Sequence, residues 1–333
     1  VIPSGKLPKY SYIPELNVEI AKMVQRLNSD QVILVDQAKG FDCQTMTIGD
    51  MVHPNPVGAE KMAEVWFTAM KKILLPSEQT FTPEIITYKK GDKYDLKLHI
   101  FKPRNAKKED KLPVMIYFFG GGWVNGTPLQ YYRECAYYAS KGMVAIAADY
   151  RISSLHKTTA FESAEDARDA IRWVRQNARQ LQIDPSRIAA SGSSAGGHLA
   201  AVTGIIEEKL AVGQVSSKPN LLLLYYPVVD NSESGYGPKD MKTRYQEISP
   251  LHNITSKAPA TLFILGTKDA LIPVKTGEEF KLKMEQAGVY CELDLIEGAG
   301  HPIFLYAKPL TEKFYTIRNI SDEFLKKYGY LKK

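Results

Sequence analysis

A serine flanked by small residues is the side chain of this sequence best placed to do chemistry. Residues 192–196 read GSSAG and match the pattern G-x-S-x-G, with Ser194 at the centre. An apolar run precedes the pattern, and a second apolar run, suited to a helix, follows it. Because small residues let a strand and a helix pass closely, such a turn holds its serine in a strained, exposed conformation. The pattern predicts a nucleophilic hydroxyl on Ser194.

A serine nucleophile needs a base, and His301 is the candidate. It follows the last predicted strand, 291–296, in the sequence GAGH, where the strand pattern stops. Loops after parallel strands meet at one edge of a sheet, so we expect His301 to reach Ser194 and take its proton. The other histidines have weaker claims. His198 lies one helical turn after the serine and is expected to pack or hydrogen-bond locally, and three more lack flanking glycines or a strand end: His99, His156 and His252.

The acid that supports the histidine should lie between the serine and the histidine in the chain. Asp269 follows the apolar run 261–265, in the sequence GTKDALIP. We expect Asp269 to fix the tautomer of His301 and to stabilise the imidazolium. Asp230, at the end of the run 221–229, is the alternative acid, because the end of the preceding strand also comes near that edge.

A glycine turn supplies candidate donors for stabilising negative charge. Residues 120–122 are three glycines that follow an apolar run. Backbone N–H groups free of side chains can point at a developing alkoxide, and each such donor contributes about 2.7 to 4 kcal/mol. We assign the oxyanion hole to the N–H groups of Gly121 and Gly122, joined by that of Ala195. Trp123 follows the turn and is expected to form one wall of the substrate site.

Strand and helix patterns alternate along the chain from Glu84 onward. Such alternation is typical of an α/β fold with a mainly parallel sheet and right-handed crossovers. Apolar residues at helical spacing mark helices along 164–178, around Phe280 and Met284 as far as Gly288, and around Phe314, Ile317, Phe324 and Leu325. The predicted strands are 84–89 and 96–101, flanking a turn at Gly91 and Asp92, then 114–119, 144–148, the strand that leads from Arg187 to the serine, 221–229, 261–265 and 291–296.

Residues 84–333 resemble the hormone-sensitive-lipase-like branch of the α/β-hydrolases, the acetyl esterase and carboxylesterase group. The matching features are the glycine turn, DYR at 149–151, DPSRI at 184–188, and the GTKDALIP and GAGH runs. The resemblance implies an α/β-hydrolase fold and ester hydrolysis through an acyl-serine intermediate, with no metal or cofactor. In that family the glycine motif usually begins with histidine, which helps to hold the loop. Here Phe119 takes that position, so another contact must preorganise the turn.

The first 75 residues have a pattern of their own. Helical stripes at 15–27 and 56–75 flank an apolar run at 32–35, which we predict to be a short buried strand. One strand between two helices cannot bury its own apolar faces. We therefore expect residues 1–75 to be a piece of something larger, or to dock on the rest of the chain or on a second copy. The polar, proline-bounded stretch 76–83 is the predicted linker.

Residues 2–74 resemble the last block of SGNH (GDSL-type) hydrolases, in a DxxHPN-x-x-G run that precedes a Met-Ala helix. The resemblance implies that Asp50 and His53 are the acid and base of a triad. The family's earlier blocks, which carry its serine and oxyanion residues, have no counterpart here. We therefore favour a structural histidine beside a capped helix start, and interpret the segment as the remnant of an upstream esterase domain. The chain begins with Val and is expected to be a processed or truncated product.

Composition limits the remaining classes of function. The 333 residues are 44% hydrophobic and 24% charged, with 43 basic and 37 acidic residues and a net charge of +6. This composition is typical of a soluble globular protein. The sequence has no basic block with interleaved aromatic residues, which is the pattern that would indicate nucleic-acid binding. No apolar run approaches the roughly 18 residues of a membrane span. The cysteines, at positions 43, 135 and 291, have neither metal-ligand spacing nor the density of a disulfide framework.

The predicted reaction is hydrolysis of short acyl groups, acetyl foremost, from small-molecule or polysaccharide esters. The carbohydrate substrate rests on both segments resembling carbohydrate-deacetylating esterases, and the altered amino-terminal cap region suggests an open site for large substrates. Alternatives are a feruloyl esterase, a serine peptidase or amidase of the same fold, and a non-catalytic binding module. A polysaccharide substrate would imply a periplasmic or extracellular enzyme. Any other substrate would imply a cytoplasmic enzyme. A homo-oligomer formed through the amino-terminal segment is a further expectation.

Overall fold

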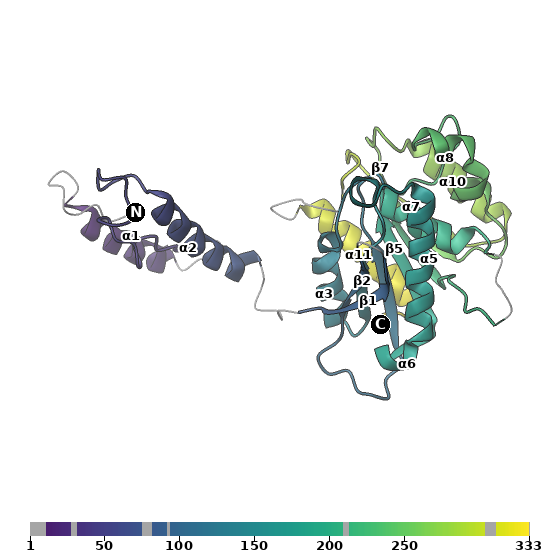
Figure 1. Cartoon of the computed structure of the whole chain (residues 1–333), viewed down its shortest axis with the longest axis horizontal. Helices are drawn as coiled ribbons and strands as arrows, with labels where there is room; N and C mark the ends of the chain where they lie inside the picture. Colours follow the sequence, from purple (N-terminus) through teal and green to yellow (C-terminus); the bar gives the residue numbers. More distant parts are fainter. Residues whose placement is uncertain are drawn as a thin grey trace. The chain divides into compact units, whose positions relative to one another are not determined.

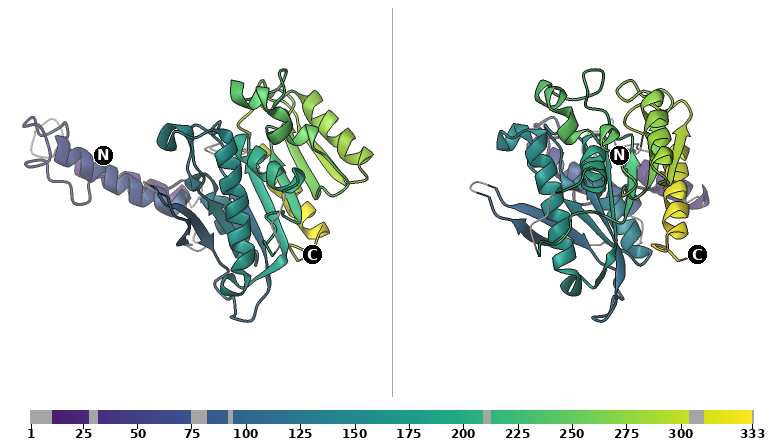
Figure 2. Two further views of the ribbon diagram at one scale, coloured as in Figure 1. Left: turned by 45° about the vertical axis from the view of Figure 1, so that its right-hand side comes forward. Right: turned by 90° about the vertical axis from the view of Figure 1, so that its right-hand side faces the viewer.

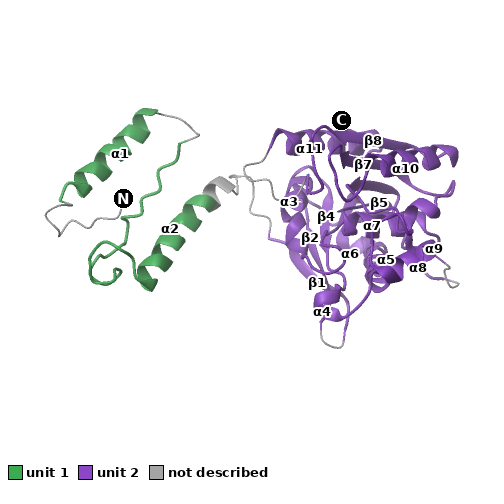
Figure 3. Ribbon diagram, turned by 90° about the horizontal axis from the view of Figure 1, so that it is seen from above, with its two compact units in different colours: residues 1–80 green, residues 81–333 purple. Residues whose placement is uncertain are grey.

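The chain forms two compact units (Figures 1 and 3). Unit 1 covers residues 1–80 and unit 2 residues 81–333. Most of the predicted linker 76–83 lies outside the described residues, as does Asp92 of the predicted turn. The computed structural model describes residues 11–27, 32–74, 82–91, 94–208, 213–303 and 311–332.

Unit 1 contains helices α1 (Ile13–Leu27) and α2 (Pro56–Leu74) at the predicted places. Asn55 caps α2, since its side-chain oxygen accepts a hydrogen bond from the N–H of Gly58 at 3.0 Å. The strand predicted at 32–35 is wrong. Residues 32–35 pair with no neighbouring strand among the described residues, and most of their side chains are exposed. An apolar run becomes a strand only where another strand pairs with its backbone.

Unit 2 is built on one eight-stranded sheet in the order β1-β2-β4-β3-β5-β6-β7-β8. The first two pairings in this order, β1 with β2 and β2 with β4, are antiparallel, and the remaining ones are parallel. This is the predicted α/β-hydrolase fold with a mainly parallel sheet. The strands are β1 (Glu84–Lys89), β2 (Leu96–Phe101), β3 (Leu112–Phe118), β4 (Val144–Ala148), β5 (Ile183–Ser193), β6 (Leu221–Tyr225), β7 (Ala260–Gly266) and β8 (Cys291–Ile296).

Two strands depart from their predicted bounds near the site. The strand predicted at 221–229 ends at Tyr225, because Tyr226 takes a left-handed φ of 37° and the chain leaves the ladder there. The backbone N–H of Val228 then donates to the carbonyl of Ser194 at 3.2 Å. The strand predicted at 114–119 ends one residue early, at Phe118. At both strand ends the chain turns toward Ser194.

Helices cover both faces of the sheet. Figures 1 and 3 show α3 (Tyr132–Ser140) and α11 (Glu312–Lys327) on one side, and α5 (Ala160–Gln176) and α7 (Ala195–Ile205) on the other. The right-hand view of Figure 2 shows the strands between α5, in teal, and α11, in yellow. Helix α10 (Val274–Gln286) packs on β7 and β8. The shorter elements are α4 (Ser153–His156), α6 (Ala178–Leu181), α8 (Lys239–Thr243), α9 (Tyr245–Ile248), η2 (Pro128–Tyr131) and η3 (Pro250–His252).

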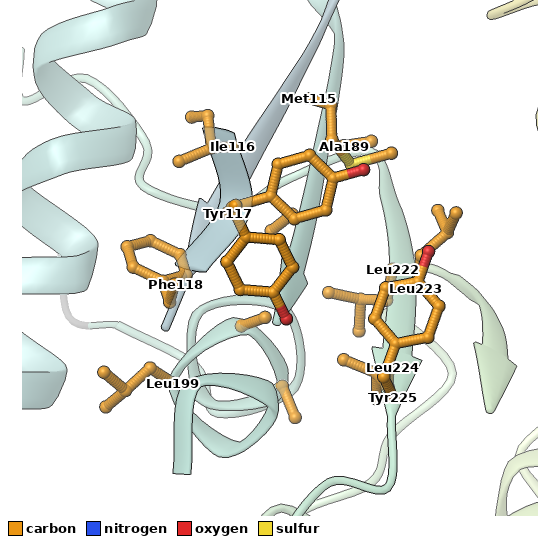
Figure 4. Packing of buried hydrophobic residues seen from close by; sticks show 14 of the residues in the cluster. Met115, Ile116, Tyr117, Phe118, Ala189, Leu199, Leu222, Leu223, Leu224 and Tyr225 are labelled. Carbon is orange, nitrogen blue, oxygen red and sulfur yellow. The ribbon is translucent and has the colours of Figure 1, made fainter. Parts of the chain in front are cut away.

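The core lies around the central strands β3, β5 and β6 (Figure 4). Residues 115–118 of β3 and 222–225 of β6 are completely buried, with Leu199 of α7 among them. Strands covered on both faces read as continuous apolar runs, which is why the sequence marks them clearly. The hydroxyl of Tyr225 pairs with Ser321 of α11 at 3.0 Å and satisfies a buried polar group. The carboxyl ends of these strands are therefore held on a rigid frame.

Candidate active site

Ser194 lies on a strained turn between β5 and α7. Its φ is 52° and its ψ is −119°. A positive φ is costly for a residue with a side chain, and such strain persists only where the surroundings enforce it. Here the backbone N–H of Ser194 donates to the carbonyl of Tyr225 at 3.1 Å, and its carbonyl accepts from Val228 at 3.2 Å. The turn is therefore fixed by the neighbouring strand end.

The glycines of the G-x-S-x-G pattern are sterically required. A Cβ atom on Gly192 would lie 2.4 Å from the backbone carbon of Gly196. A Cβ atom on Gly196 would lie 2.0 Å from the carbonyl oxygen of Phe118 at the end of β3. Both distances are far below van der Waals contact, so neither position accepts a side chain without moving backbone. The close approach that the sequence predicts is present.

His301 connects Ser194 to Asp269. Its Nε2 lies 2.8 Å from the Oγ of Ser194, and its Nδ1 lies 2.8 Å from an Oδ atom of Asp269. The side chain of His301 is 16% exposed and that of Asp269 is fully buried. The ring of Tyr226 stands edge-on to the imidazole, with centroids 4.9 Å apart. The three residues that the sequence singles out at different strand ends thus form one hydrogen-bonded chain.

The carboxylate of Asp269 is oriented by the backbone that follows it. One of its oxygens accepts hydrogen bonds from the N–H groups of Leu271 and Ile272, at 2.8 and 2.9 Å. The other oxygen is left to accept from Nδ1 of His301. That bond places the ring proton on Nδ1, so Nε2 can accept the hydrogen of the Ser194 hydroxyl. This is the arrangement that a general base requires.

The alternative acid and the other histidines of unit 2 have different partners. Asp230 lies 3.9 Å from Nδ1 of His252 and accepts from the N–H of Ser232, with no contact to His301 among the described residues. His198 is completely buried, and its Nε2 lies 2.9 Å from the carbonyl of Ile248. Burial lowers the pKa of His198 to about 4, since charging it there is unfavourable. The remaining two histidines form hydrogen bonds elsewhere: His99 with the hydroxyl of Tyr132, and His156 with the backbone of Ile152.

The glycine turn after β3 lies beside the serine. A Cβ atom on Gly120 would come within 3.6 Å of the Cβ of Ser194. Gly121 and Gly122 have positive φ values of 138° and 63°. The N–H groups of these two glycines have no hydrogen-bond partner in the described part of the chain. Ala195 is the first residue of α7, where backbone N–H groups have no intrahelical partner. The role of Gly121, Gly122 and Ala195 as oxyanion donors stays a prediction.

Two side chains hold this turn in place of the family's histidine. The ring of Phe119 stacks on Tyr150 with centroids 4.0 Å apart, and the Tyr150 hydroxyl donates to the carbonyl of Phe119 at 2.7 Å. The side-chain amide of Gln130 forms two hydrogen bonds with the backbone of Gly120, each 3.0 Å long. Sequence reasoning placed Tyr150 only within a family motif and missed Gln130. A polar residue in a loop, ten positions beyond the turn, carries no periodic signal that would reveal this contact.

Trp123 follows the turn but is almost completely buried, with 3% of its surface exposed. Its backbone φ is 60°. Its indole stands edge-on to the buried His198 ring, with centroids 5.1 Å apart, and lies 6.3 Å from the ring of Tyr236. The side chain thus packs among other aromatic rings. Its contact with a substrate stays a prediction.

The pair Asp50 and His53 in unit 1 is a local, exposed feature. Nδ1 of His53 lies 2.6 Å from a carboxylate oxygen of Asp50. This hydrogen bond from the His53 ring, with two more from the backbone N–H groups of Val52 and His53, lowers the pKa of Asp50 to about 2. Asn55, and not Asp50, caps the helix that follows.

Within the described ranges, no group of three or more His, Cys, Asp and Glu side chains is placed to hold an ion. No disulfide joins the three cysteines, of which Cys135 and Cys291 are buried. None of the described helices is both long and apolar enough to cross a bilayer.

Comparison with known proteins places the sheet and its site among esterases. Residues 98–232 match the BD-FAE family. Esterase LipC of Mycobacterium tuberculosis is 30% identical over 57% of this chain, and the chain spans about half of its length (52%). The ethyl acetate hydrolase of Pseudomonas putida is 28% identical over 63% of this chain and 72% of its own.

A solved structure gives broader coverage. Est2, a thermophilic esterase of Thermogutta terrifontis, is 39% identical in sequence, with a TM-score of 0.70, over 75% of this chain and 94% of its own. Est2 has also been solved with propionate bound, with butyrate bound, and after phosphorylation by paraoxon.

Proposed function

This chain belongs to the α/β-hydrolase esterases, and on that premise we propose that it hydrolyses short acyl esters with Ser194 as nucleophile, His301 as general base and acid, and Asp269 as the acid that orients the histidine. One observation carries the proposal. It is the unbroken hydrogen-bonded chain Ser194–His301–Asp269, with 2.8 Å at both links, beside a glycine turn in which the N–H groups of Gly121 and Gly122 are unpaired among the described residues. Geometry of this kind defines a triad independently of the fold that carries it.

In the acylation step, the Oγ of Ser194 attacks the ester carbonyl while its proton passes to Nε2 of His301. The carbonyl oxygen becomes an oxyanion, which the N–H groups of Gly121, Gly122 and Ala195 stabilise. Helix α7 adds the positive end of its dipole at the same place. Collapse of the intermediate expels the alcohol, which takes the proton from His301. A water molecule then attacks the acyl-serine by the same route and releases the acid.

We assign short acyl groups, acetyl foremost, as the substrate class. We take Trp123, which directly follows the oxyanion turn and whose buried indole packs against the His198 ring, as the residue that limits the size of the acyl group. The named relatives agree in chemistry: one hydrolyses ethyl acetate, and another binds propionate and butyrate. For the alcohol we propose an acetylated carbohydrate, on the resemblance of both segments to carbohydrate-deacetylating esterases. Trp123 would form the acyl wall.

We propose that unit 1 is the remnant of an SGNH-type domain and takes no part in this chemistry. The Asp50–His53 pair supports that origin, since it has the spacing of the acid and base of that family. Contacts made by unit 1 with a second copy of the chain would explain its exposed apolar helix residues, which include Trp66, Phe67 and Met70. A variant lacking residues 1–75 should retain turnover of small esters, and loss of that turnover would contradict this assignment.

A chain-length panel tests the substrate class. With p-nitrophenyl acetate, butyrate, octanoate and ferulate at equal concentrations, kcat/KM should fall steeply beyond butyrate, and Ser194→Ala should abolish all turnover. The release of acetate from acetylated xylan and acetylated xylo-oligosaccharides tests the carbohydrate. An aryl amide, p-nitroacetanilide, should not turn over. Octanoate or ferulate as the best substrate would refute the short acyl pocket, and efficient amide cleavage would indicate a peptidase.

A further inference from the structure

We propose that Gln130 is the positioning residue of the oxyanion hole, and that its side-chain amide sets the direction of the Gly121 N–H. This inference rests on the proposed esterase function. Gln130 lies on η2, ten residues beyond the turn that it holds. Its Nε2 donates to the carbonyl of Gly120, and its Oε1 accepts from the N–H of Gly120, both at 3.0 Å. The side-chain amide thus pairs with the backbone as a neighbouring strand would.

The effect on the oxyanion hole follows from the planarity of the peptide bond. The carbonyl of Gly120 and the N–H of Gly121 belong to one trans peptide unit, so they point in opposite directions. A donor that fixes the carbonyl therefore also fixes the N–H on the far side. Because Gln130 holds the carbonyl, the Gly121 N–H is directed away from η2. Polarisation along the unit also makes that N–H a better donor.

The neighbouring peptide units are held by other means. The unit between Phe119 and Gly120 is fixed at both ends, by the Tyr150 hydroxyl on its carbonyl and by Gln130 on its N–H. The carbonyl of Gly121 accepts from the backbone N–H groups of Val124 and Asn125, both at 3.1 Å. That pair of bonds orients the Gly122 N–H without any side chain. Of the two glycine donors, only that of Gly121 depends on Gln130.

Gln130 is itself held by a short, well-anchored turn. The hydroxyl of Thr127 accepts from the N–H of Leu129 at 3.1 Å and caps η2. Tyr131, the next residue, is completely buried and stacks on Tyr117 of β3 at 4.5 Å. The turn is thereby fixed to the same strand whose end carries the glycines. Because η2 is held rigidly, the Gln130 side chain can orient the Gly121 N–H with the precision that catalysis requires.

Two substitutions separate this role from a general effect on folding. Gln130→Leu keeps the size of the side chain but removes both hydrogen bonds, so the peptide unit is free to rotate. Gln130→Glu keeps the acceptor for the Gly120 N–H. Its ionised carboxylate cannot donate to the Gly120 carbonyl, whereas its protonated form can, so its defect should shrink as the pH falls. Leu129→Ala, an exposed position on the same turn, is the matched control.

The experiment measures kcat and KM for p-nitrophenyl acetate in the full chain, with the active serine titrated by paraoxon. Deleting one oxyanion donor costs on the order of 10² to 10³ in kcat, so misdirecting one should lower kcat by about 10- to 100-fold in Gln130→Leu, with KM within about threefold. The affinity of a trifluoromethyl ketone, whose adduct places an oxyanion in the hole, should fall by a similar factor. Leu129→Ala should match the wild type.

The pH arm uses Gln130→Glu. Its kcat relative to the wild type should rise by at least fivefold from pH 8 to pH 5.5, and a constant ratio would overturn the proposal. So would a Gln130→Leu variant within threefold of the wild type in kcat, or one whose loss lies in KM alone. If the wild type itself fails to hydrolyse any of the aryl esters, the proposed function is refuted. An active wild type with unaffected Gln130 variants would refute this inference only.

Discussion

Replacing Asp269 by asparagine should disable the site while leaving its shape almost unchanged. In the wild type, one carboxylate oxygen accepts from two backbone N–H groups, those of Leu271 and Ile272, and the other accepts from His301. An asparagine has one acceptor oxygen and one NH2 group for these two places. The orientation of the asparagine amide determines which tautomer of His301 is present.

The two backbone N–H groups determine the orientation of the amide. If the amide oxygen faced His301, the NH2 group would point at the N–H donors of Leu271 and Ile272 and leave both without this acceptor, which costs about 1 to 3 kcal/mol for the buried donor of Ile272. If the oxygen faces the two N–H groups, only the single contact to His301 is reversed. The ring can accept the NH2 hydrogen on Nδ1 by moving its own proton to Nε2. The second arrangement is favoured, and in it Nε2 can no longer accept the Ser194 proton.

The wrong tautomer should lower kcat for p-nitrophenyl acetate by about 10⁴-fold, which corresponds to about 5.5 kcal/mol of activation free energy. The assay compares kcat at pH 8 for Asp269→Asn and Asp230→Asn, normalised to the intact serine content. Asp230 contacts Ser232 and the His252 region, so Asp230→Asn should stay within about threefold of the wild type. A loss below tenfold for Asp269→Asn, or an equal loss for Asp230→Asn, would refute the reasoning.

Two further predictions concern the frame around the site. In Gly196→Ala the new Cβ would lie 2.0 Å from the Phe118 carbonyl oxygen and 2.4 Å from that of Phe119, so backbone must move. Such overpacking costs about 1 to 3 kcal/mol. The Tm should fall by about 2 to 12 °C and kcat should drop with it, and a variant unchanged in both would contradict the steric account. His198, with its pKa lowered from 6.5 to about 4, is neutral when folded and binds a proton on unfolding, so its contribution is complete above pH 6.5 and is lost as the pH falls toward 4. That contribution is about 3 kcal/mol. The urea midpoint should therefore fall less between pH 7 and pH 5 in His198→Gln than in the wild type, and equal falls would contradict the assignment.

The central sheet could be predicted because its strands are covered on both faces. Burial on both sides turns β4 into an apolar run with clear ends, and its predicted bounds match the observed ones. The same logic placed Ser194, Asp269 and His301 at strand ends, where the structure brings them together. The apolar run at residues 32–35 wrongly predicted a strand, since no strand among the described residues pairs with it.

The support around the glycine turn could not be predicted in the same way. Gln130 reaches the turn from the short element η2, and Tyr150 reaches it from the segment after β4. Their side-chain hydrogen bonds leave no periodic pattern in the sequence. The only hint was indirect: the family resemblance implies a histidine where this chain has Phe119, so another contact was expected to hold the turn. Helix α3, whose buried side includes the charged Glu134, also had no clear apolar stripe in the sequence.

The position of covalent modification by paraoxon tests the central claim most directly. Paraoxon transfers a diethylphosphoryl group to an activated serine, and peptide mass spectrometry locates the group. The account predicts one group per chain, on the peptide that contains Ser194, with ester turnover lost in proportion to labelling. Labelling of a different residue, or turnover that persists after Ser194 is fully labelled, would contradict it.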